Sequence, residues 1–295
     1  MVIVLAFIMI QEKNSKDLKK VSVIIQNSDD NQWSAFKYGL KMAAEDQGVE
    51  MFIVSTGNLM NAQELKEAIE REIKKGVDGI IVQPVPGEDT ETMLKTIKIR
   101  VPIMLVKSTA SKDRDASMIP TTEPDNYAMG ANLAEELLRD YNGEISGKTL
   151  GILSETSDSE DVINRKRGFI DGVKKTGVRI KWTVADPFVE TEKNSLDAQP
   201  KVDIVIALDD SSLTTVGRYS AANNLHGALV YGIGNSTEAV YYLDSGAVKC
   251  LIVPDEFNVG YQSLTEMAQS LRHYFHKAQD QTVSYTVMRR NTLFS

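Results

Sequence analysis

The chain of 295 residues contains few of the residues that build disulfides, zinc centres and nucleic-acid surfaces. Its only cysteine, Cys250, lies inside an apolar run. A single cysteine cannot form an intramolecular disulfide, and it cannot supply a zinc or iron–sulfur cluster. We therefore expect a buried, unreactive thiol. The net charge of −8 at pH 7 provides no basic footprint, so no nucleic-acid partner is expected.

Sequence signatures of enzymes are also missing. The chain has neither a phosphate-binding GxxxxGK[ST] loop nor a GxSxG nucleophile elbow. The carboxylate pairs Asp29–Asp30 and Asp209–Asp210 each follow a predicted strand. Such pairs could act as acid and base, or could accept hydrogen bonds from a ligand, but no nucleophile lies near them. We therefore expect no enzyme activity and no cofactor.

Histidine is scarce, and its positions do not indicate a metal site. His273 and His276 lie three residues apart in a predicted helix, a spacing that could bind a metal with one further ligand. Their neighbours Arg272 and Lys277 favour a solvated helix face instead. No metal is expected.

The sequence does contain a series of short apolar runs rich in Val, Ile and Leu. Most are separated by ten to twenty residues of helical pattern, as in Gln32–Gln47 and Asn61–Lys75. Continuous apolar strands that alternate with helices indicate parallel sheets buried on both faces. The runs are residues 21–26, 50–55, 77–84, 101–106, 147–153, 202–208, 228–233 and 248–253.

The second half of the chain repeats the architecture of the first, though not its sequence. Pro124 is expected at the first position of a helix over 124–141, with Thr122 or Glu123 as its cap. Tyr127 in that helix and Ile163 in the helix over 160–176 are expected to face the core.

The first ten residues, MVIVLAFIMI, are wholly apolar and are followed by a polar linker. Ten residues are about half of the twenty that a bilayer requires. We interpret residues 1–20 as a shortened or late-started export signal or membrane anchor with its linker; a buried first strand is the alternative.

Several stretches of the chain resemble a known family. The stretch VSVIIQNSDDNQWSAFKYGLKMAAEDQGVEMFIVST is similar to the first strand–helix–strand unit of periplasmic sugar-binding proteins of the ribose and galactose type. Their fold is shared with the effector domains of the lactose-repressor family. Further similar stretches, in the family's order and spacing, are VDGIIVQPVP (77–86), VPIMLVKS (101–108), DNYAMGANLAEELL (125–138), NRKRGFIDGV (164–173) and residues 231–260.

The resemblance implies the type I periplasmic binding protein fold, in which two similar α/β lobes are joined by three hinge crossings. It places the N-terminal lobe at 21–118 plus 256–284 and the C-terminal lobe at 119–253 plus 287–295. The crossings would fall near Ile119–Glu123, Val253–Asp255 and Val283–Met288. A small ligand would bind between the lobes, which close around it.

The resemblance also implies a set of ligand-binding residues by position. Trp33 is suited to stacking on a sugar's apolar face, although core packing would explain it equally simply. Arg165 matches the family's arginine, with a surface arginine as the alternative. Asp209 occupies a ligand-contacting position, while Asp210 is expected to cap the following helix. The full set is Gln26, Asp30, Trp33, Lys107, Arg165, Phe188, Asp209 and Asn235.

The chain departs from the family pattern at three places. Lys107-Ser108 replaces an Asp-Arg pair, Gly234 replaces an aspartate, and Pro254 replaces a polar hinge residue. The hydrogen-bonding set for ribose or glucose is therefore incomplete. Two acids (Asp30 and Asp209) with two bases (Lys107 and Arg165) could suit a charged or zwitterionic ligand, or could form a satisfied network.

These observations predict an extracytoplasmic solute-binding protein for a small polar, sugar-like ligand. Its partner would be an ABC transporter permease or a membrane sensor kinase. The alternative is the effector-binding domain of a lactose-repressor-type transcriptional regulator without its DNA-binding segment.

Overall fold

The structure, a computed structural model, describes residues 18–29, 31–57, 61–85, 87–107, 119–157, 159–186, 195–273 and 275–293. The apolar segment 1–10 lies outside the described residues, so the predicted signal or anchor stays a prediction. Within the described ranges, no helix has both the length and the apolar character that crossing a membrane requires.

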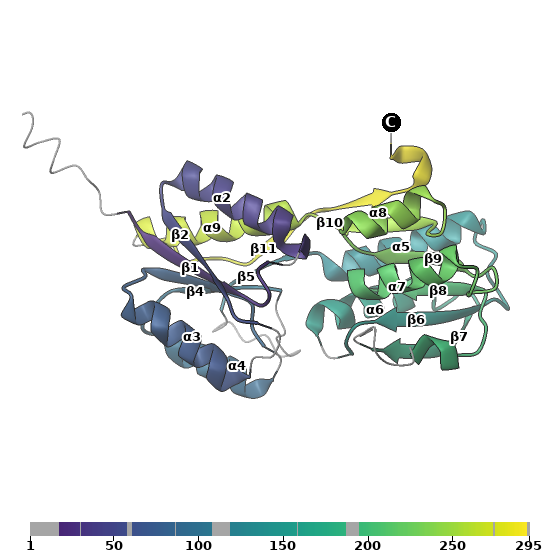
Figure 1. Ribbon diagram of the computed structural model, residues 1–295, viewed down its shortest axis with the longest axis horizontal. Helices are drawn as coiled ribbons and strands as arrows, with labels where there is room; N and C mark the ends of the chain where they lie inside the picture. The colour runs from purple at the N-terminus through teal and green to yellow at the C-terminus, as the bar shows by residue number, and fades with distance from the viewer. Residues whose placement is uncertain are drawn as a thin grey trace, which may run out of the picture.

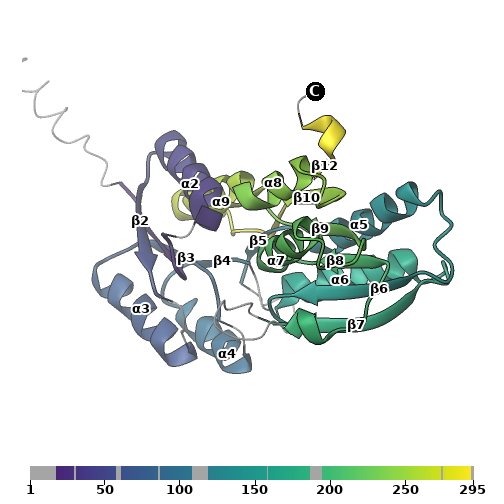
Figure 2. The same ribbon diagram turned by 45° about the vertical axis from the view of Figure 1, so that its right-hand side comes forward.

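The described residues form two six-stranded sheets, which Figures 1 and 2 show as two lobes. The first sheet has the order β11-β5-β4-β3-β1-β2, and the second has the order β12-β10-β9-β8-β6-β7. Neighbouring strands are parallel except for β10 and β12, which are antiparallel. The predicted parallel sheets are confirmed. The strands are β1 (Lys20–Ile25), β2 (Glu50–Ser55), β3 (Gly79–Val82), β4 (Ile103–Val106), β5 (Thr121–Pro124), β6 (Thr149–Ser154), β7 (Arg179–Ala185), β8 (Ile204–Ala207), β9 (Leu229–Ile233), β10 (Cys250–Pro254), β11 (Gln281–Val283) and β12 (Tyr285–Met288).

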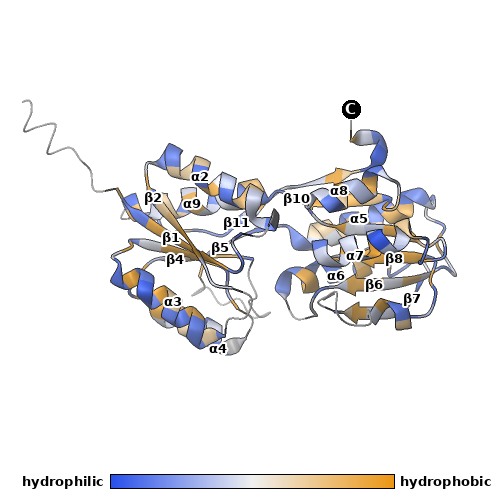
Figure 3. Cartoon of the chain, viewed as in Figure 1, coloured by the Kyte–Doolittle hydropathy of each residue, from blue (hydrophilic) through white to orange (hydrophobic). Residues whose placement is uncertain are grey.

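Helices cover both faces of each sheet, which is why the central strands are apolar throughout (Figure 3). In the first lobe α2 and α9 pack on one face, and α3 and α4 pack on the other. In the second lobe the two faces are covered by α5 with α6 and by α7 with α8. The helices are α2 (Ser34–Gln47), α3 (Ala62–Lys74), α4 (Glu88–Ile97), α5 (Asn126–Asp140), α6 (Glu160–Val173), α7 (Asp210–Ala221), α8 (Thr237–Asp244) and α9 (Glu256–Arg272), with 3-10 turns η1 (Asn31–Trp33), η2 (Ser195–Ala198) and η3 (Arg290–Thr292).

Cys250 belongs to the core of the second lobe, as predicted. Its side chain is fully buried, and burial raises the pKa of the thiol to about 12. A thiol with such a pKa is almost entirely protonated at neutral pH, and the protonated form is a poor nucleophile.

Local sequence explains where several helices begin. Asn61 caps α3, accepting hydrogen bonds from the backbone N–H groups of Gln63 and Glu64. The prediction for Pro124 is wrong: this residue ends β5, and Asp125 caps α5 by accepting from the N–H of Ala128. An aspartate one residue later is the stronger cap, so the proline stays in the strand.

Two residues that the helical period placed in the core are instead partly exposed. Tyr127 is 40% exposed and Ile163 is 38% exposed. The helices α5 and α6 pack against each other as closely as they pack on the sheet, so their buried faces are rotated toward Met129 and Phe169. Tyr127 lies instead on the outer edge of this helix pair, where its hydroxyl donates to Asp171.

In the described part of the chain, three connections cross between the lobes. They run from β5 to α5, from β10 to α9 and, through Ser284, from β11 to β12. They lie side by side, because Asp125 N–H donates to Val283 O and Asp255 N–H donates to Ser284 O. Thr121–Pro124 pair with the first sheet. The predicted lobe boundaries themselves stay a prediction.

Candidate functional site

Polar side chains gather where the strands of the two sheets end. In the first lobe, Gln26 follows β1, and Lys107 follows β4. The Gln26 backbone is held from both sides: its N–H donates to the side-chain oxygen of Gln83, and its carbonyl accepts from the indole N–H of Trp33. The chain just beyond the carboxyl end of β1 is thus fixed by hydrogen bonds to Gln83 and Trp33.

Trp33 packs in the core, and its role in stacking on a ligand stays a prediction. It is only 1% exposed and belongs to the core of the first lobe, edge-on to Phe36. The Nζ atom of Lys107 lies 4.3 Å from the centre of its ring. A cation at this distance from an indole face is attracted by the ring quadrupole. The aromatic face is therefore turned toward the strand ends, and in this structure a lysine lies over it.

Glu256 approaches the same lysine from the start of α9. Its Oε1 atom lies 3.9 Å from Lys107 Nζ, and the residue is 6% exposed. Its other oxygen, Oε2, is buried without a hydrogen-bond partner. Trp33, Lys107 and Glu256 together form a cluster that we call the lysine cluster.

Arg165 lies on α6 in the second lobe and is 8% exposed. Its Nε donates to the Asn126 side chain at 2.9 Å and its NH1 donates to the Leu208 carbonyl at 3.0 Å. Its NH2 lies 3.7 Å from Asp161. Burial alone would raise the pKa of Asp161, but the Arg165 charge and local hydrogen bonds outweigh it, so that pKa is lowered. Arg165 is thus fixed by several partners instead of lying on the open surface.

Asp209 follows β8 and is the N-cap of α7. One carboxylate oxygen accepts from the Ser212 N–H and the other accepts from the Glu155 N–H at 2.7 Å. Burial nevertheless raises the pKa of Asp209. Glu155 is exposed as a whole residue, but surrounding protein atoms and the Asp209 charge raise the pKa of its carboxyl. Two carboxylates therefore lie close together at the ends of β6 and β8.

The prediction that Asp210 caps α7 is wrong, because Asp209 is the N-cap, whereas the prediction that Asp209 contacts a ligand stays a prediction. Asp210 instead accepts from the backbone N–H groups of Asn235 and Ser236, both at 2.8 Å. A Cβ on Gly234 would lie 2.6 Å from the same Asp210 oxygen. A carboxylate from the neighbouring strand end thus occupies the space that a side chain at position 234 would need.

The two lobes act on each other electrostatically at this edge. The charge of Lys107, from the first lobe, acts on the carboxyls of Glu155 and Asp161 in the second, lowering the pKa of each relative to what burial would produce. Lys107 of the first lobe thus lies within electrostatic reach of Glu155 and Asp161 of the second. The predicted site residues Asp30 and Phe188, and Ser108 beside Lys107, lie outside the described residues.

Three acidic residues of this region were not predicted as site residues. Glu155 directly follows β6 and Glu256 follows β10 by two residues, so the rule that ligands bind beyond strand ends could have found both. Asp161 lies one helical turn before Arg165 and could have been found as its i, i+4 partner.

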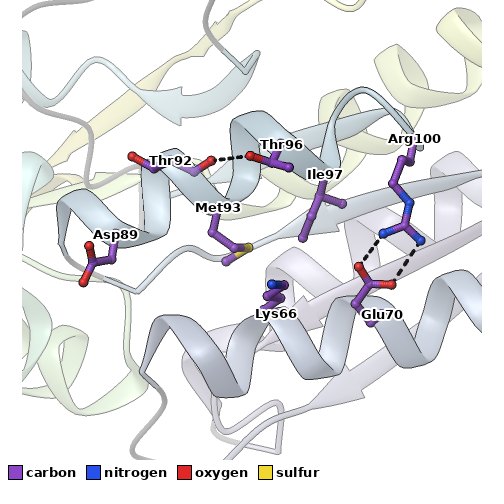
Figure 4. Close-up of a pocket in the computed structure, with 8 residues that line it drawn as sticks. All are labelled: Lys66, Glu70, Asp89, Thr92, Met93, Thr96, Ile97 and Arg100. Carbon is purple, nitrogen blue, oxygen red and sulfur yellow. Dashed lines mark hydrogen bonds and ion pairs between the residues drawn. The ribbon is translucent and has the colours of Figure 1, made fainter.

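A second hollow lies away from the strand ends, between α3 and α4 (Figure 4). It has a volume of about 350 Å³. At one end Arg100 forms a bidentate ion pair with Glu70, and Met93 and Ile97 line the middle. Its lining shares no residue with the arrangement described above.

The chain belongs to the periplasmic binding protein family. The family described as "Periplasmic binding protein domain" matches residues 21–274, which is most of the chain. This match agrees with the order of strands and helices in both lobes, and it confirms the resemblance found in the sequence.

Solved structures show the same fold at low sequence identity. A glucose-galactose binding protein, GanP, from Geobacillus stearothermophilus has a TM-score of 0.80 at 20% identity, covering 94% of this chain and 99% of its own. A carbohydrate transporter solute binding protein from Agrobacterium radiobacter, in complex with D-arabinose, has a TM-score of 0.82 at 18% identity, with coverages of 95% and 97%. The XylFII–LytSN complex contains a chain with a TM-score of 0.77 at 14% identity, with coverages of 94% and 99%.

A curated relative shows the link to repressors. The HTH-type transcriptional repressor PurR from Pasteurella multocida is 27% identical over 176 residues, which are 59% of this chain and 49% of the repressor. The chain therefore spans about half the length of the curated relative it matches.

Proposed function

We propose that this protein is an extracytoplasmic solute-binding protein that captures a small polar, sugar-like ligand between its lobes. The observation that supports the proposal is that polar side chains gather at the carboxyl ends of strands in both lobes, with Lys107 over Trp33 in the first lobe and with Arg165 and Asp209 in the second. Binding proteins of similar fold carry sugars in their names or hold D-arabinose. In this proposal the protein binds its ligand without transforming it, as the name of its family implies.

A thermal-shift screen against sugars, polyols, amino sugars and amino acids tests ligand binding. Ligand that binds only the folded state stabilises it, by about 2.7 kcal/mol at a hundred times the dissociation constant. We expect one class of compound to raise the melting temperature in proportion to the logarithm of its concentration. A screen in which no compound raises it would contradict the proposal.

Arg165→Lys tests the position of the site. The substitution keeps the positive charge but removes the planar fork, so it should reduce the ligand-induced shift strongly. Arg100→Lys, in the hollow between α3 and α4, is a matched control and should leave the shift unchanged. An unchanged shift in Arg165→Lys would place the ligand elsewhere.

The partner in this proposal is a membrane protein, either an ABC permease or a sensor kinase. The first fits the transporter assignment of the arabinose-bound neighbour, and the second fits the XylFII–LytSN complex. Deleting the gene separates them: loss of ligand uptake indicates a permease, whereas loss of ligand-dependent transcription with uptake intact indicates a sensor. Protection of the protein from external protease in intact spheroplasts would contradict the extracytoplasmic location.

The match to a PurR repressor favours one alternative, the effector-binding domain of a transcriptional regulator. This alternative, an effector-binding domain without its DNA-binding segment, requires the protein to be in the cytoplasm. Cell fractionation distinguishes the two, because a regulator would be recovered with the cytoplasmic proteins.

A further inference from the structure

The lysine cluster contains a carboxylate whose charge needs a cation beside it. Glu256 is 6% exposed, and its Oε2 has no hydrogen-bond partner among the described residues. Within the same part of the chain, the positive charge that lies within 4 Å of its carboxylate is Lys107 Nζ, at 3.9 Å. A buried charge that loses its partner is strongly destabilising. Glu256 therefore requires that a cation stay in this position.

Lys107 also covers the aromatic face that a ligand would use. Trp33 is 1% exposed, and Lys107 Nζ lies over its ring at 4.3 Å. A ligand can reach the indole face only if the lysine moves away, and that movement takes the lysine from Glu256 as well. Lys107 is 26% exposed, so room for the movement exists on the solvent side.

The opposite lobe offers the displaced lysine new partners. Glu155 and Asp161 are carboxylates on which Lys107 already acts across the gap. Among the described residues of this region, the carboxylates Glu155, Asp161, Asp209 and Glu256 outnumber the cations Lys107 and Arg165. An anionic ligand would meet this excess of negative charge, and a neutral ligand on Trp33 would leave Glu256 without a counter-charge.

We propose that the ligand is a polyhydroxylated compound with a protonated amine, such as an amino sugar, and that Glu256 and Trp33 bind this amine where Lys107 Nζ now lies. This inference rests on the proposed function and names its substrate class. Lys107 acts as a stand-in for the ligand's cation, and on binding it turns toward Glu155 and Asp161. Glu256 is then the residue that selects an amine over a hydroxyl.

Calorimetric titration with matched sugars tests the selection. The pairs are D-glucosamine against D-glucose and D-galactosamine against D-galactose, with the N-acetyl derivatives as uncharged amides. We expect one amino sugar to bind at least about tenfold tighter than its neutral counterparts, the scale of a desolvated cation–π contact. Equal binding of the neutral sugar overturns this inference alone, whereas failure of every sugar and amino sugar to bind overturns the proposed function as well.

Two substitutions test the roles of Glu256 and Lys107. For one of them, the inference predicts that removing a side chain from the site tightens ligand binding. Glu256→Gln keeps the shape and should remove most of the preference for the amine. Lys107→Met removes the competing cation and should tighten amino-sugar binding by about tenfold. A lysine that binds the ligand directly would weaken binding when lost, so weaker binding by Lys107→Met overturns the inference.

Lys148→Met is the matched control. Lys148 Nζ also lies over an aromatic ring, 5.9 Å from the centre of Tyr141, and beside a carboxylate, 3.8 Å from Asp203. It precedes β6 at the opposite edge of the second sheet. Its loss should leave both affinity and selectivity unchanged, and an equal gain in Lys148→Met would overturn the stand-in role of Lys107.

Discussion

At the scale of single residues, Glu155 and Asp209 form a pair of like charges whose effect on stability depends on pH. The pKa of each is raised in the folded protein above the ordinary values of 4.5 and 3.8. The folded state therefore holds these protons more tightly than the unfolded chain does. The pair lowers stability at neutral pH, and this loss is recovered as the pH falls through the raised pKa values.

Glu155→Gln should therefore raise the melting temperature at pH 7, because it removes one of the two like charges. The difference from the unchanged protein should shrink as the pH falls toward about 3, where both carboxyls are largely protonated in both states. Thermal denaturation of the ligand-free protein across pH measures this. Glu144→Gln, an exposed residue before β6, is the control, and a gain that persists at acid pH would contradict the explanation.

Arg289 stabilises the buried carboxylate of Glu136, and a single substitution tests this role. Its guanidinium donates to Glu136, which is 2% exposed, and to Asp140 on the same helix. Arg289→Ala should lower the free energy of unfolding by about 2–3 kcal/mol, because only the exposed Arg139 would remain beside the buried Glu136. Urea denaturation measures the change. Arg290→Ala, an exposed neighbour, should stay within about 0.5 kcal/mol, and equal effects of the two would contradict this account.

At the scale of elements, the two lobes contain matching helix pairs that meet through glycine. Gly39 and Gly260 allow α2 to lie against α9, and Gly130 and Gly168 allow α5 to lie against α6. A Cβ at Gly130 would overlap the carbonyl oxygen of Arg165, and one at Gly39 would overlap that of Phe257. Backbone cannot move aside as a flexible side chain can, so both pairs depend on the absence of a side chain.

Gly130→Ala should destabilise the protein by about 2 kcal/mol, as expected for overpacking of a close contact. It should also weaken ligand binding, because it displaces the stretch of α6 that carries Arg165. Chemical denaturation and titration measure the two effects. Glu135→Ala, on the exposed face of α5, is the control and should change neither. A stable variant with unchanged affinity would show that the helices have room to separate.

Sequence periodicity predicted most elements of this fold but failed at contacts between helices. Helix 61–75 and strand 50–55 could be predicted because Asn61, Gly76 and the apolar runs are local signals. Tyr127 and Ile163 were wrongly predicted to be buried. Their helices contact both a sheet and another helix, and the spacing of apolar residues along one helix does not show which side the second helix covers. β11 and β12 are separated only by Ser284 but join different sheets, which periodicity along the chain does not reveal.

The site was less predictable than the fold, because the roles of its residues depend on contacts between distant parts of the chain. Lys107 and Arg165 could be proposed from their order in the chain. Glu256 and Glu155 could not be assigned roles that way, because their importance comes from a distant lysine and a neighbouring strand end. Whether the carboxylate of Asp209 or Asp210 caps α7 depends on loop geometry, which two adjacent aspartates do not reveal.

At the scale of the whole molecule, the arrangement predicts closure about the crossings between the lobes. Since Lys107 and Arg165 belong to different lobes, a ligand contacting both should draw the lobes together. We expect the radius of gyration, measured by small-angle X-ray scattering, to fall when ligand saturates the protein and to stay constant for Arg165→Lys at the same ligand concentration. A ligand that raises the melting temperature without changing the radius would contradict closure.

The chain returns to the first lobe after most of the second lobe has been made, and this order has a consequence for biosynthesis. The first sheet is completed by β11 and covered by α9, and both come from residues 256–283 of a 295-residue chain. While a ribosome is still making the second half, the strands of the first half remain without β11, and the face that α2 and α9 share has only α2 on it. The nascent first half therefore keeps apolar surface uncovered until residues 256–283 have emerged.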